Sequence, residues 1–335
     1  MLKKYYFYIL SFSLFLAITV VVLGAYTRLS DAGLGCPDWP GCYGSLTVPE
    51  AVDDNQYQRP LETGKAWKEM LHRYAAGTLG LCILLIVFIT LKYKKQLKQS
   101  LGLPFALLTT VTFQALLGMW TVTQLLTPTI VTAHLVGGFL TLSLLWWLWL
   151  NQKNASSHQH TLTRLSPEKL KKLSQYSVIA LILLIIQILL GGWTSTNYAA
   201  LACGTSFPDC ADGLWTFANL DFINGFNLTW EAGVNYEFGI KDSAARMTIH
   251  FTHRIGALIV FIYFIALVIH IIRNRIKALT MLTHPLLFLL VIQIVLGISN
   301  VVFVLPMSVA VAHNMVALLL LLIVIALNHR LIKSR

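Results

Sequence analysis

The sequence predicts an all-α integral membrane protein whose eight transmembrane helices form two tandem, pseudo-two-fold related four-helix bundles. Three observations support this prediction. Of the 335 residues, 56% are hydrophobic and only 12% are charged, with a mean hydropathy of +0.69. Apolar runs recur eight times along the chain, and motifs of the first half return in the second half. Charged residues make up about a quarter of soluble domains, so the composition excludes a soluble globular enzyme and a disordered or fibrous chain.

Each of the eight apolar runs is long enough to form a transmembrane helix. About 20 residues, at 1.5 Å per residue, cross the roughly 30 Å of hydrocarbon in a bilayer. The first run resembles a signal peptide, but it is too long for the apolar part of one and lacks a cleavage site of small residues. We therefore expect it to remain as a helix. The runs cover residues 7–27, 69–91, 104–124, 130–150, 176–196, 247–272, 283–304 and 307–328.

The charged residues between these runs predict the orientation of the helices. Lysine and arginine concentrate in cytoplasmic loops. Here 17 of the 25 basic residues fall on one side of the bundle, with Glu168 as the single acid, and the other 13 acidic residues fall on the opposite side. We therefore expect both termini in the cytoplasm and a multi-pass location in the inner (plasma) membrane. The net charge of +11 then reflects topology and contact with the lipid bilayer, and we expect no nucleic-acid partner.

An internal repeat divides the chain into two domains. The string LGAYT at 23–27 matches LGGWT at 190–194, and each precedes a pair of cysteines. Four helices per half, an even number, predict parallel repeats related by an axis along the membrane normal. We expect an N-terminal half at 1–150, a cytoplasmic linker at 151–175 and a C-terminal half at 176–335. Further matches, displaced by 178 to 181 residues, pair His72 with His253, Gln114 with Gln293, Gly118 with Gly297, Pro128 with Pro306 and His134 with His313.

Four histidines occupy matching places in the two halves. His72, His134, His253 and His313 lie on helices expected to run from outside to inside, all at a similar depth near the extracytoplasmic face. Ionisable groups inside a membrane are costly and often mark functional sites. Two histidines on facing helices suit axial ligation of a heme iron, whereas hydrogen bonding between helices is the structural alternative. The matching placement favours two heme sites. A bare metal is less favoured because no cysteine cluster or carboxylate pair completes a set of ligands.

One position breaks the repeat. Glu69 stands three residues before His72, whereas His250 stands three residues before His253, and this spacing puts each on the helix face of the histidine. A carboxylate near a porphyrin can act as an acid or base, while a heme between two histidines suits electron storage. We therefore expect the chemistry in the first half. The alternative for Glu69 is a first-turn carboxylate favoured by the helix dipole, and His250 is either a neighbour of the ligand or an interfacial residue.

An arginine directly follows the presumed ligand in each half, as Arg73 and Arg254. A guanidinium matches the geometry of a carboxylate, so both arginines are candidates to bind heme propionates. An equally good account is that their long side chains reach out to lipid headgroups at the outer interface.

Each of the two long outer segments contains a pair of cysteines. Cys36 and Cys42 flank the sequence PDWPG, and Cys203 and Cys210 flank GTSFPD, both rich in turn-forming residues. Disulfides persist outside the cytosol, so one disulfide within each loop is favoured. Metal binding and free thiols are the alternatives, but neither pair has the two-residue spacing or the nearby histidines typical of zinc sites.

These motifs together resemble the heme A synthase family, and the resemblance covers nearly the whole chain. It implies an eight-helix oxidoreductase that oxidises the C8 methyl group of heme O to a formyl group, which gives heme A through hydroxylated intermediates. The residues that carry the resemblance are GAYTRLSDAGLGCPDWPGC at 24–42, Glu69-x-x-His72-Arg73, Thr132-Ala133-His134, Thr252-His253-Arg254 and Ala312-His313.

The resemblance also implies a role for each pair of histidines. His253 and His313 would hold heme b, with its iron, as a cofactor. His72 and His134 would hold the substrate heme, with Glu69 as the catalytic carboxylate. The disulfides would be structural, since the chemistry does not require them.

The expected partners are heme O and heme A, a heme O synthase, cytochrome oxidase assembly factors and an electron donor that the sequence does not identify. A homo-oligomer is compatible with the sequence. Two other functions stay open, a diheme b-type electron-transfer protein linked to a quinol and a heme carrier or assembly factor. Glu69 favours the enzyme, because electron transfer alone needs no carboxylate beside the heme.

Overall fold

The computed structural model describes residues 1–53, 57, 59–153, 166–205, 207–208, 210 and 220–334. Within these residues the regular structure is helical, and an isolated β-bridge pairs Cys42 with Ser45. Eight of the helices are long and apolar enough to span a membrane, which confirms the predicted all-α, multi-pass membrane protein. The helices are α1 (Leu2–Leu29), α2 (Thr63–Leu97), α3 (Gly102–Thr123), α4 (Pro128–Gln152), α6 (Pro167–Thr196), α7 (Phe222–Gly225), α8 (Ser243–Arg273), α9 (Lys277–Val302) and α10 (Met307–Lys333).

Helix α6 begins at Pro167, ahead of its predicted start. The Ser166 side chain accepts a hydrogen bond from the Lys169 N–H (3.4 Å), and a proline occupies the first turn. These capping features start a helix in a polar stretch that hydropathy alone does not detect. The link between the halves is therefore shorter than the predicted 151–175, and its residues 154–165 lie outside the described part of the chain.

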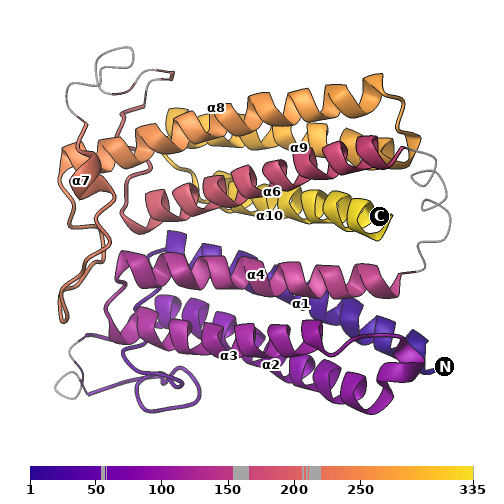
Figure 1. Ribbon diagram of the computed structural model, residues 1–335. Helices are drawn as coiled ribbons and strands as arrows, with labels where there is room; N and C mark the ends of the chain where they lie inside the picture. Colours follow the sequence, from indigo (N-terminus) through magenta and orange to yellow (C-terminus); the bar gives the residue numbers. More distant parts are fainter. Residues whose placement is uncertain are drawn as a thin grey trace.

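The spanning helices form two groups of four that lie side by side (Figure 1). In the first group α1 packs on α2 and α4, and α3 packs on α2 and α4. The second group repeats this pattern, with α6, α8, α9 and α10 in the places of α1 to α4. The groups meet where α4 contacts α6 and α10 and where α1 contacts α10. Helix α10 is the most buried of the eight spans, because it has neighbours in both groups.

The outer surface of the spans carries large apolar side chains. Phe15, Leu81, Phe88, Ile262 and Phe288 are each at least 59% exposed. In water this surface would be strongly unfavourable, whereas in a bilayer it meets hydrocarbon. The buried core lies between the helices, with Ile83, Leu142, Leu145 and Phe264 fully enclosed.

The two ends of the bundle differ in character. Both termini lie at one end, which we call the terminal end (Figure 1). The opposite end, the loop end, carries the long segments between α1 and α2 and between α6 and α8. A disulfide closes a loop in each segment, Cys36–Cys42 in the first and Cys203–Cys210 in the second. Both predicted disulfides are therefore present at the loop end.

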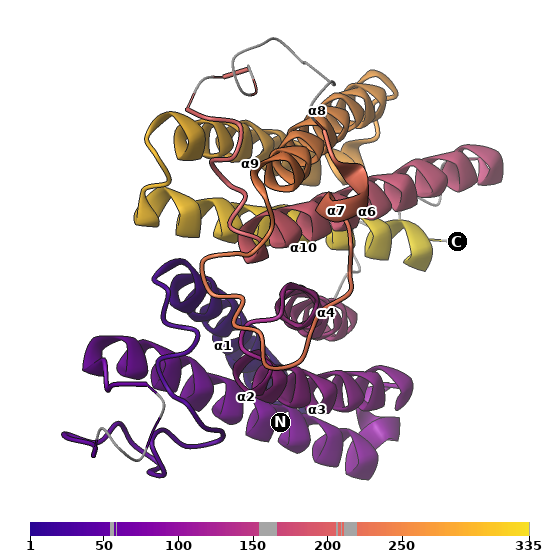
Figure 2. The ribbon, with the colours of Figure 1, turned by 90° about the vertical axis from the view of Figure 1, so that its left-hand side faces the viewer.

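Residues 226–241, which we call the crossing segment, connect the second group to the first. Figure 2 shows this segment running from α7 over the end of the first group and back to α8. The Tyr236 N–H donates to the Leu125 carbonyl (3.0 Å), and the Thr129 hydroxyl donates to the Leu228 carbonyl (3.1 Å). The two halves are thus joined at the loop end as well as along their helices.

Candidate functional site

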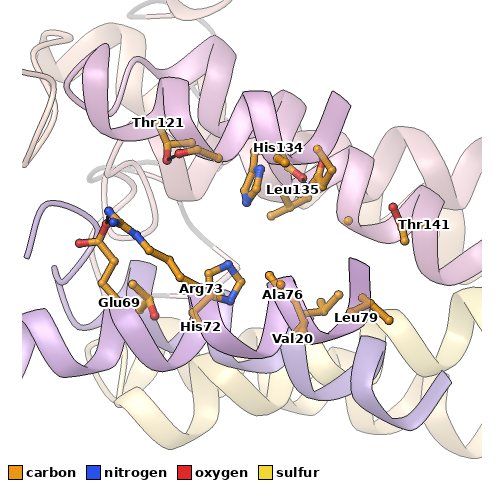
Figure 3. A pocket seen from close by; sticks show the side chains of 18 of the residues that line it. Val20, Glu69, His72, Arg73, Ala76, Leu79, Thr121, His134, Leu135 and Thr141 are labelled. Atoms are coloured by element: carbon orange, nitrogen blue, oxygen red, sulfur yellow. Dashed lines mark hydrogen bonds and ion pairs between the residues drawn. The ribbon is translucent and has the colours of Figure 1, made fainter. Parts of the chain in front are cut away.

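The first group of helices encloses a cavity of about 970 Å³ near the loop end. Glu69, His72 and Arg73 line it from α2, and His134 lines it from α4. Most of the remaining lining is apolar, as in pockets that bind large organic ligands. Figure 3 shows the two histidines facing each other across this cavity, with Glu69 and Arg73 together to one side.

The predicted pair His72 and His134 is brought together by the fold. Their ring centroids are 6.4 Å apart, and the ring planes are nearly perpendicular at 82°. Two metal–imidazole bonds of about 2 Å, with a ring radius added on each side, place two ring centroids about 6 Å apart. The observed separation therefore suits two axial ligands of one metal ion.

The exposure of this pair supports the same interpretation. Both rings line the cavity and are only partly buried, so each has an accessible side that faces it. The Nδ1 atom of each ring is enclosed by protein, without a hydrogen-bond partner among the described residues. A heme iron between the two rings fits imidazole donors at this separation.

In the second group, His253 on α8 and His313 on α10 take the positions that His72 and His134 hold in the first. The Gln187 side-chain nitrogen lies 3.1 Å from Nδ1 of His253, and the Gln293 side-chain nitrogen lies 3.1 Å from Nε2 of His313. The Nδ1 atom of His313 is buried without a partner among the described residues. Glutamines of neighbouring helices thus contact one ring nitrogen of each histidine in the second pair, and binding of a heme there stays a prediction.

Each of the four histidines packs against a glycine of a neighbouring helix. A Cβ atom at Gly24 would lie 3.0 Å from Cε1 of His72, and one at Gly118, Gly191 or Gly297 would lie 3.2 Å from Cε1 of its histidine. Only a residue without a side chain lets the helices approach this closely. These glycines recur in the sequence repeat, but the sequence alone does not show that they contact the histidines.

We expect the replacement Gly118→Val to remove heme from the first pair. The new side chain would overlap the His134 ring, and overpacking of this kind costs about 1 to 3 kcal/mol unless the ring moves away. Absorbance titration of the purified protein with heme measures the loss. The control is Gly102→Val on the same helix, where a new Cβ meets no atom within 4 Å. Unchanged binding in Gly118→Val would contradict the packing role.

Glu69 is a buried carboxylate beside the cavity, with 4% of its surface exposed. Its Oε2 atom accepts a hydrogen bond from the Cys36 N–H (2.9 Å), and its Oε1 atom forms an ion pair with Arg73. The Arg73 guanidinium also donates to carbonyl groups of the loop closed by Cys36 and Cys42, including that of Asp38 at 2.9 Å. The disulfide loop therefore fixes both members of the ion pair. Binding of a propionate by Arg73 stays a prediction.

His250 occupies the place of Glu69 in the second group. Its neighbours, Cys203 and Arg254, correspond to Cys36 and Arg73 beside Glu69. Its Nδ1 atom lies 3.3 Å from the Cys203 nitrogen, and its Nε2 atom lies 3.2 Å from Nε of Arg254. A neutral imidazole accepts a hydrogen bond through only one nitrogen, whereas a carboxylate accepts from both donors at once. The same scaffold thus holds an acidic group beside the first histidine pair and a histidine beside the second.

The second half also contributes to the cavity, which the division at residue 150 does not predict. Ser195 and Thr196 of α6 line it, as does Asn314 of α10. Arg28 bridges the halves, because its Nη2 atom donates to the Ser195 carbonyl (2.6 Å) and its guanidinium lies 4.1 Å from the Tyr198 ring centroid. In the sequence Arg28 is a basic charge on the acidic side of the bundle, within the string at 24–42, and neither feature predicts a contact between the halves.

Tyr198 completes this bridge. Burial raises the pKa of its phenol, although the nearby Arg28 guanidinium acts in the opposite direction. The hydroxyl therefore stays protonated near neutral pH and donates to Oδ1 of Asp31 (3.3 Å). The contact joins the end of α6 to the end of α1 beside the cavity.

Comparison with known proteins places the chain among related membrane proteins. Residues 7–325 match the family model described as "Cytochrome oxidase assembly protein". A protein of Shewanella oneidensis named "Heme A synthase" is 44% identical over 96% of this chain and 95% of its own length. A "Heme A synthase" of Nitrosospira multiformis is 28% identical over 94% of this chain and 90% of its own length. One of Wolbachia pipientis subsp. Culex pipiens is 26% identical over 91% of each chain.

Proposed function

This chain belongs to the family of cytochrome oxidase assembly proteins, and we propose that it is a heme A synthase with its substrate site in the first group of helices. It is an oxidoreductase that converts the C8 methyl group of heme O to the formyl group of heme A. The observation that carries the assignment of the substrate site is Glu69, a buried carboxylate that lines the same cavity as His72 and His134.

We assign the two histidine pairs to different hemes. His72 and His134 bind the iron of heme O, and the cavity around them accommodates the porphyrin. His253 and His313 would bind heme b, whose iron can accept and pass on electrons during the oxidation. The matching positions of the two pairs support two heme sites. The presence of Glu69 beside the first pair and of His250 at the equivalent position beside the second supports different roles for the two hemes.

Glu69 is the group that assists the oxidation. It accepts a proton or stabilises positive charge that develops at the methyl carbon of the substrate. The Cys36 N–H and Arg73 hold one carboxylate oxygen each, so the group is fixed before substrate binds. A fixed carboxylate loses little free energy to reorganisation during the reaction.

The orientation in the membrane follows from charge and from the disulfides. Basic residues gather at the terminal end, which supports a cytoplasmic location for both termini. The disulfides at the loop end support an extracytoplasmic location for the cavity in an inner (plasma) membrane. Because heme O and heme A are too apolar to diffuse in water, a membrane-bound heme O synthase and oxidase assembly factors are the fitting partners.

Co-expression with a heme O synthase tests this function. After purification, the extracted porphyrins are identified by chromatography and mass. We expect the formyl or hydroxymethyl derivative of heme O together with heme B. Heme B alone, at two per chain, would contradict the proposal and favour a diheme electron-transfer protein. Bound heme O that is never converted would identify a heme carrier instead.

A further inference from the structure

The cavity of the first group extends from the histidines to a gap between α2 and α3. Gly77 and Leu81 line it there from α2, and Thr112 and Ala115 line it from α3. All four residues are also exposed at the surface of the bundle. The cavity therefore opens sideways between two membrane-spanning helices, and the opening leads into the lipid hydrocarbon.

Small residues keep this gap open. A Cβ atom built at Gly77 or at Gly80 would meet no other atom within 4 Å, so neither glycine is needed for close helix packing. Glycine in the middle of a helix is less favourable than alanine, because it loses more backbone freedom on folding. Two such residues in one helix, on the wall of a cavity, thus lower helix stability without a packing gain in the protein itself.

The corresponding region of the second group carries bulky residues. Phe261, which replaces Gly80, packs against the main hydrophobic core. Leu290, which replaces Val111, is only 2% exposed. The two groups share a helix arrangement but differ in side-chain size at this place. By the displacement of the repeat, Leu258, Phe261, Val291 and Ile294 stand in the second group where Gly77, Gly80, Thr112 and Ala115 stand in the first.

The difference matches the chemistry of the two hemes. Heme O carries a long isoprenoid tail that heme b lacks, and both have an iron that two histidines can bind. The separation of the His72 and His134 rings marks where the iron of a ligand belongs, and the gap continues from the same cavity. A ligand with a metal centre and an apolar extension would fill both parts.

On the basis of the proposed function, we propose that the gap between α2 and α3 binds the isoprenoid tail of heme O. The larger residues at the equivalent positions between α8 and α9 favour a heme without a tail in the second group. Lipid hydrocarbon is as apolar as the gap, so the preference of the first site for heme O comes from van der Waals contacts between the tail and the residues that line the gap. The opening also lets the tail remain in hydrocarbon while the porphyrin enters between the helices.

The test fills the gap with residues that the second group already uses. In the double variant Gly77→Leu/Ala115→Ile, each new side chain is the one found at the equivalent position, Leu258 or Ile294. The full-length protein is purified from cells without heme O synthase and titrated with heme O and, separately, with heme B, while absorbance reports binding. We expect the preference of the first site for heme O over heme B to fall about 10-fold or more, because the new side chains take the space in which the tail packs. Binding of heme B at that site should change little.

The control variant is Gly64→Leu. Gly64 lies on the same helix in equally open space, but it does not line the cavity. Its preference for heme O should equal that of the wild type. The b-type spectrum of the second site reports whether each variant is folded. If the double variant does not fold, Gly77→Leu and Ala115→Ile are measured singly, and each should show a smaller loss in the same direction.

The outcomes separate the gap from the proposed function. If folded variants keep the wild-type preference for heme O over heme B, the tail does not bind in the gap. Membrane lipid would then be the occupant of the gap. A wild-type protein that binds heme O and heme B equally well at the first site would overturn it too. In contrast, heme O binding that persists after His72→Ala would contradict the substrate site itself.

Discussion

Replacement of Glu69 by glutamine leaves both hemes bound and abolishes formation of the formyl group. Glutamine has the same shape and can still accept the hydrogen bond from the Cys36 N–H. It has no negative charge and is not basic, so it neither takes up a proton nor stabilises positive charge on the substrate. Loss of a general acid or base lowers rates by about 10² to 10⁴. Extracted porphyrins from cells that also make heme O measure the effect, and we expect heme O to accumulate.

The matched control for this variant is Glu62→Gln. Glu62 precedes α2 and is exposed to solvent, where it pairs with Lys65 (2.9 Å). We expect it to give normal amounts of heme A. The Arg73 guanidinium retains its carbonyl partners in Glu69→Gln, so heme content and thermal stability should stay near those of the wild type. A normal yield of heme A from Glu69→Gln would remove this residue from the mechanism.

Replacement of His253 by alanine removes the heme of the second group and stops turnover. The side chain is one of two axial ligands in our assignment, and alanine leaves an open coordination position beside Gly191. We expect the b-type spectrum to disappear from protein purified without heme O. Added heme O should still bind at His72 and His134, because the first pair is separate. Heme content and the redox spectrum of the purified protein measure the result.

His270→Ala is the control on the same helix. His270 is exposed at the terminal end of α8 and packs on the Tyr176 ring at 5.4 Å. Its loss should leave the spectrum intact. An unchanged spectrum in His253→Ala would reject the ligand assignment for the second group. Loss of heme O binding in the same variant would show that the two sites are not independent.

The histidine pairs illustrate what can be predicted from the sequence. Depth in the membrane follows from the distance between a residue and the start of its helix, so the sequence indicates that His72 and His134 lie at one level. Which helix faces which is a tertiary property, and the contact of His72 with Gly24 is therefore visible only in the fold. The sequence signal that comes closest to predicting this contact is that Gly24 and His72 both recur in the second half, as Gly191 and His253.

The surroundings of Glu69 were harder to predict. Charge complementarity suggests a propionate partner for Arg73, but the carbonyl groups it binds belong to a loop whose backbone path has no periodic pattern. The cross-half contact of Arg28 with Ser195 is equally hidden, because it depends on how the two groups of helices dock. Helix positions could thus be derived from hydropathy, whereas loop contacts and docking could not.

The crossing segment has a consequence for the evolution of this architecture. An internally repeated protein could in principle be assembled from exchangeable modules. Here residues 226–241 belong to the second half but lie on the first, where Glu237 pairs with Arg59 (3.0 Å) and Tyr236 bonds to Leu125. Each half therefore depends on the other for these contacts at the loop end. A chimera between two such proteins must take the crossing segment and the surface it covers from the same parent. Otherwise it loses the Arg59–Glu237 ion pair and the Tyr236–Leu125 hydrogen bond.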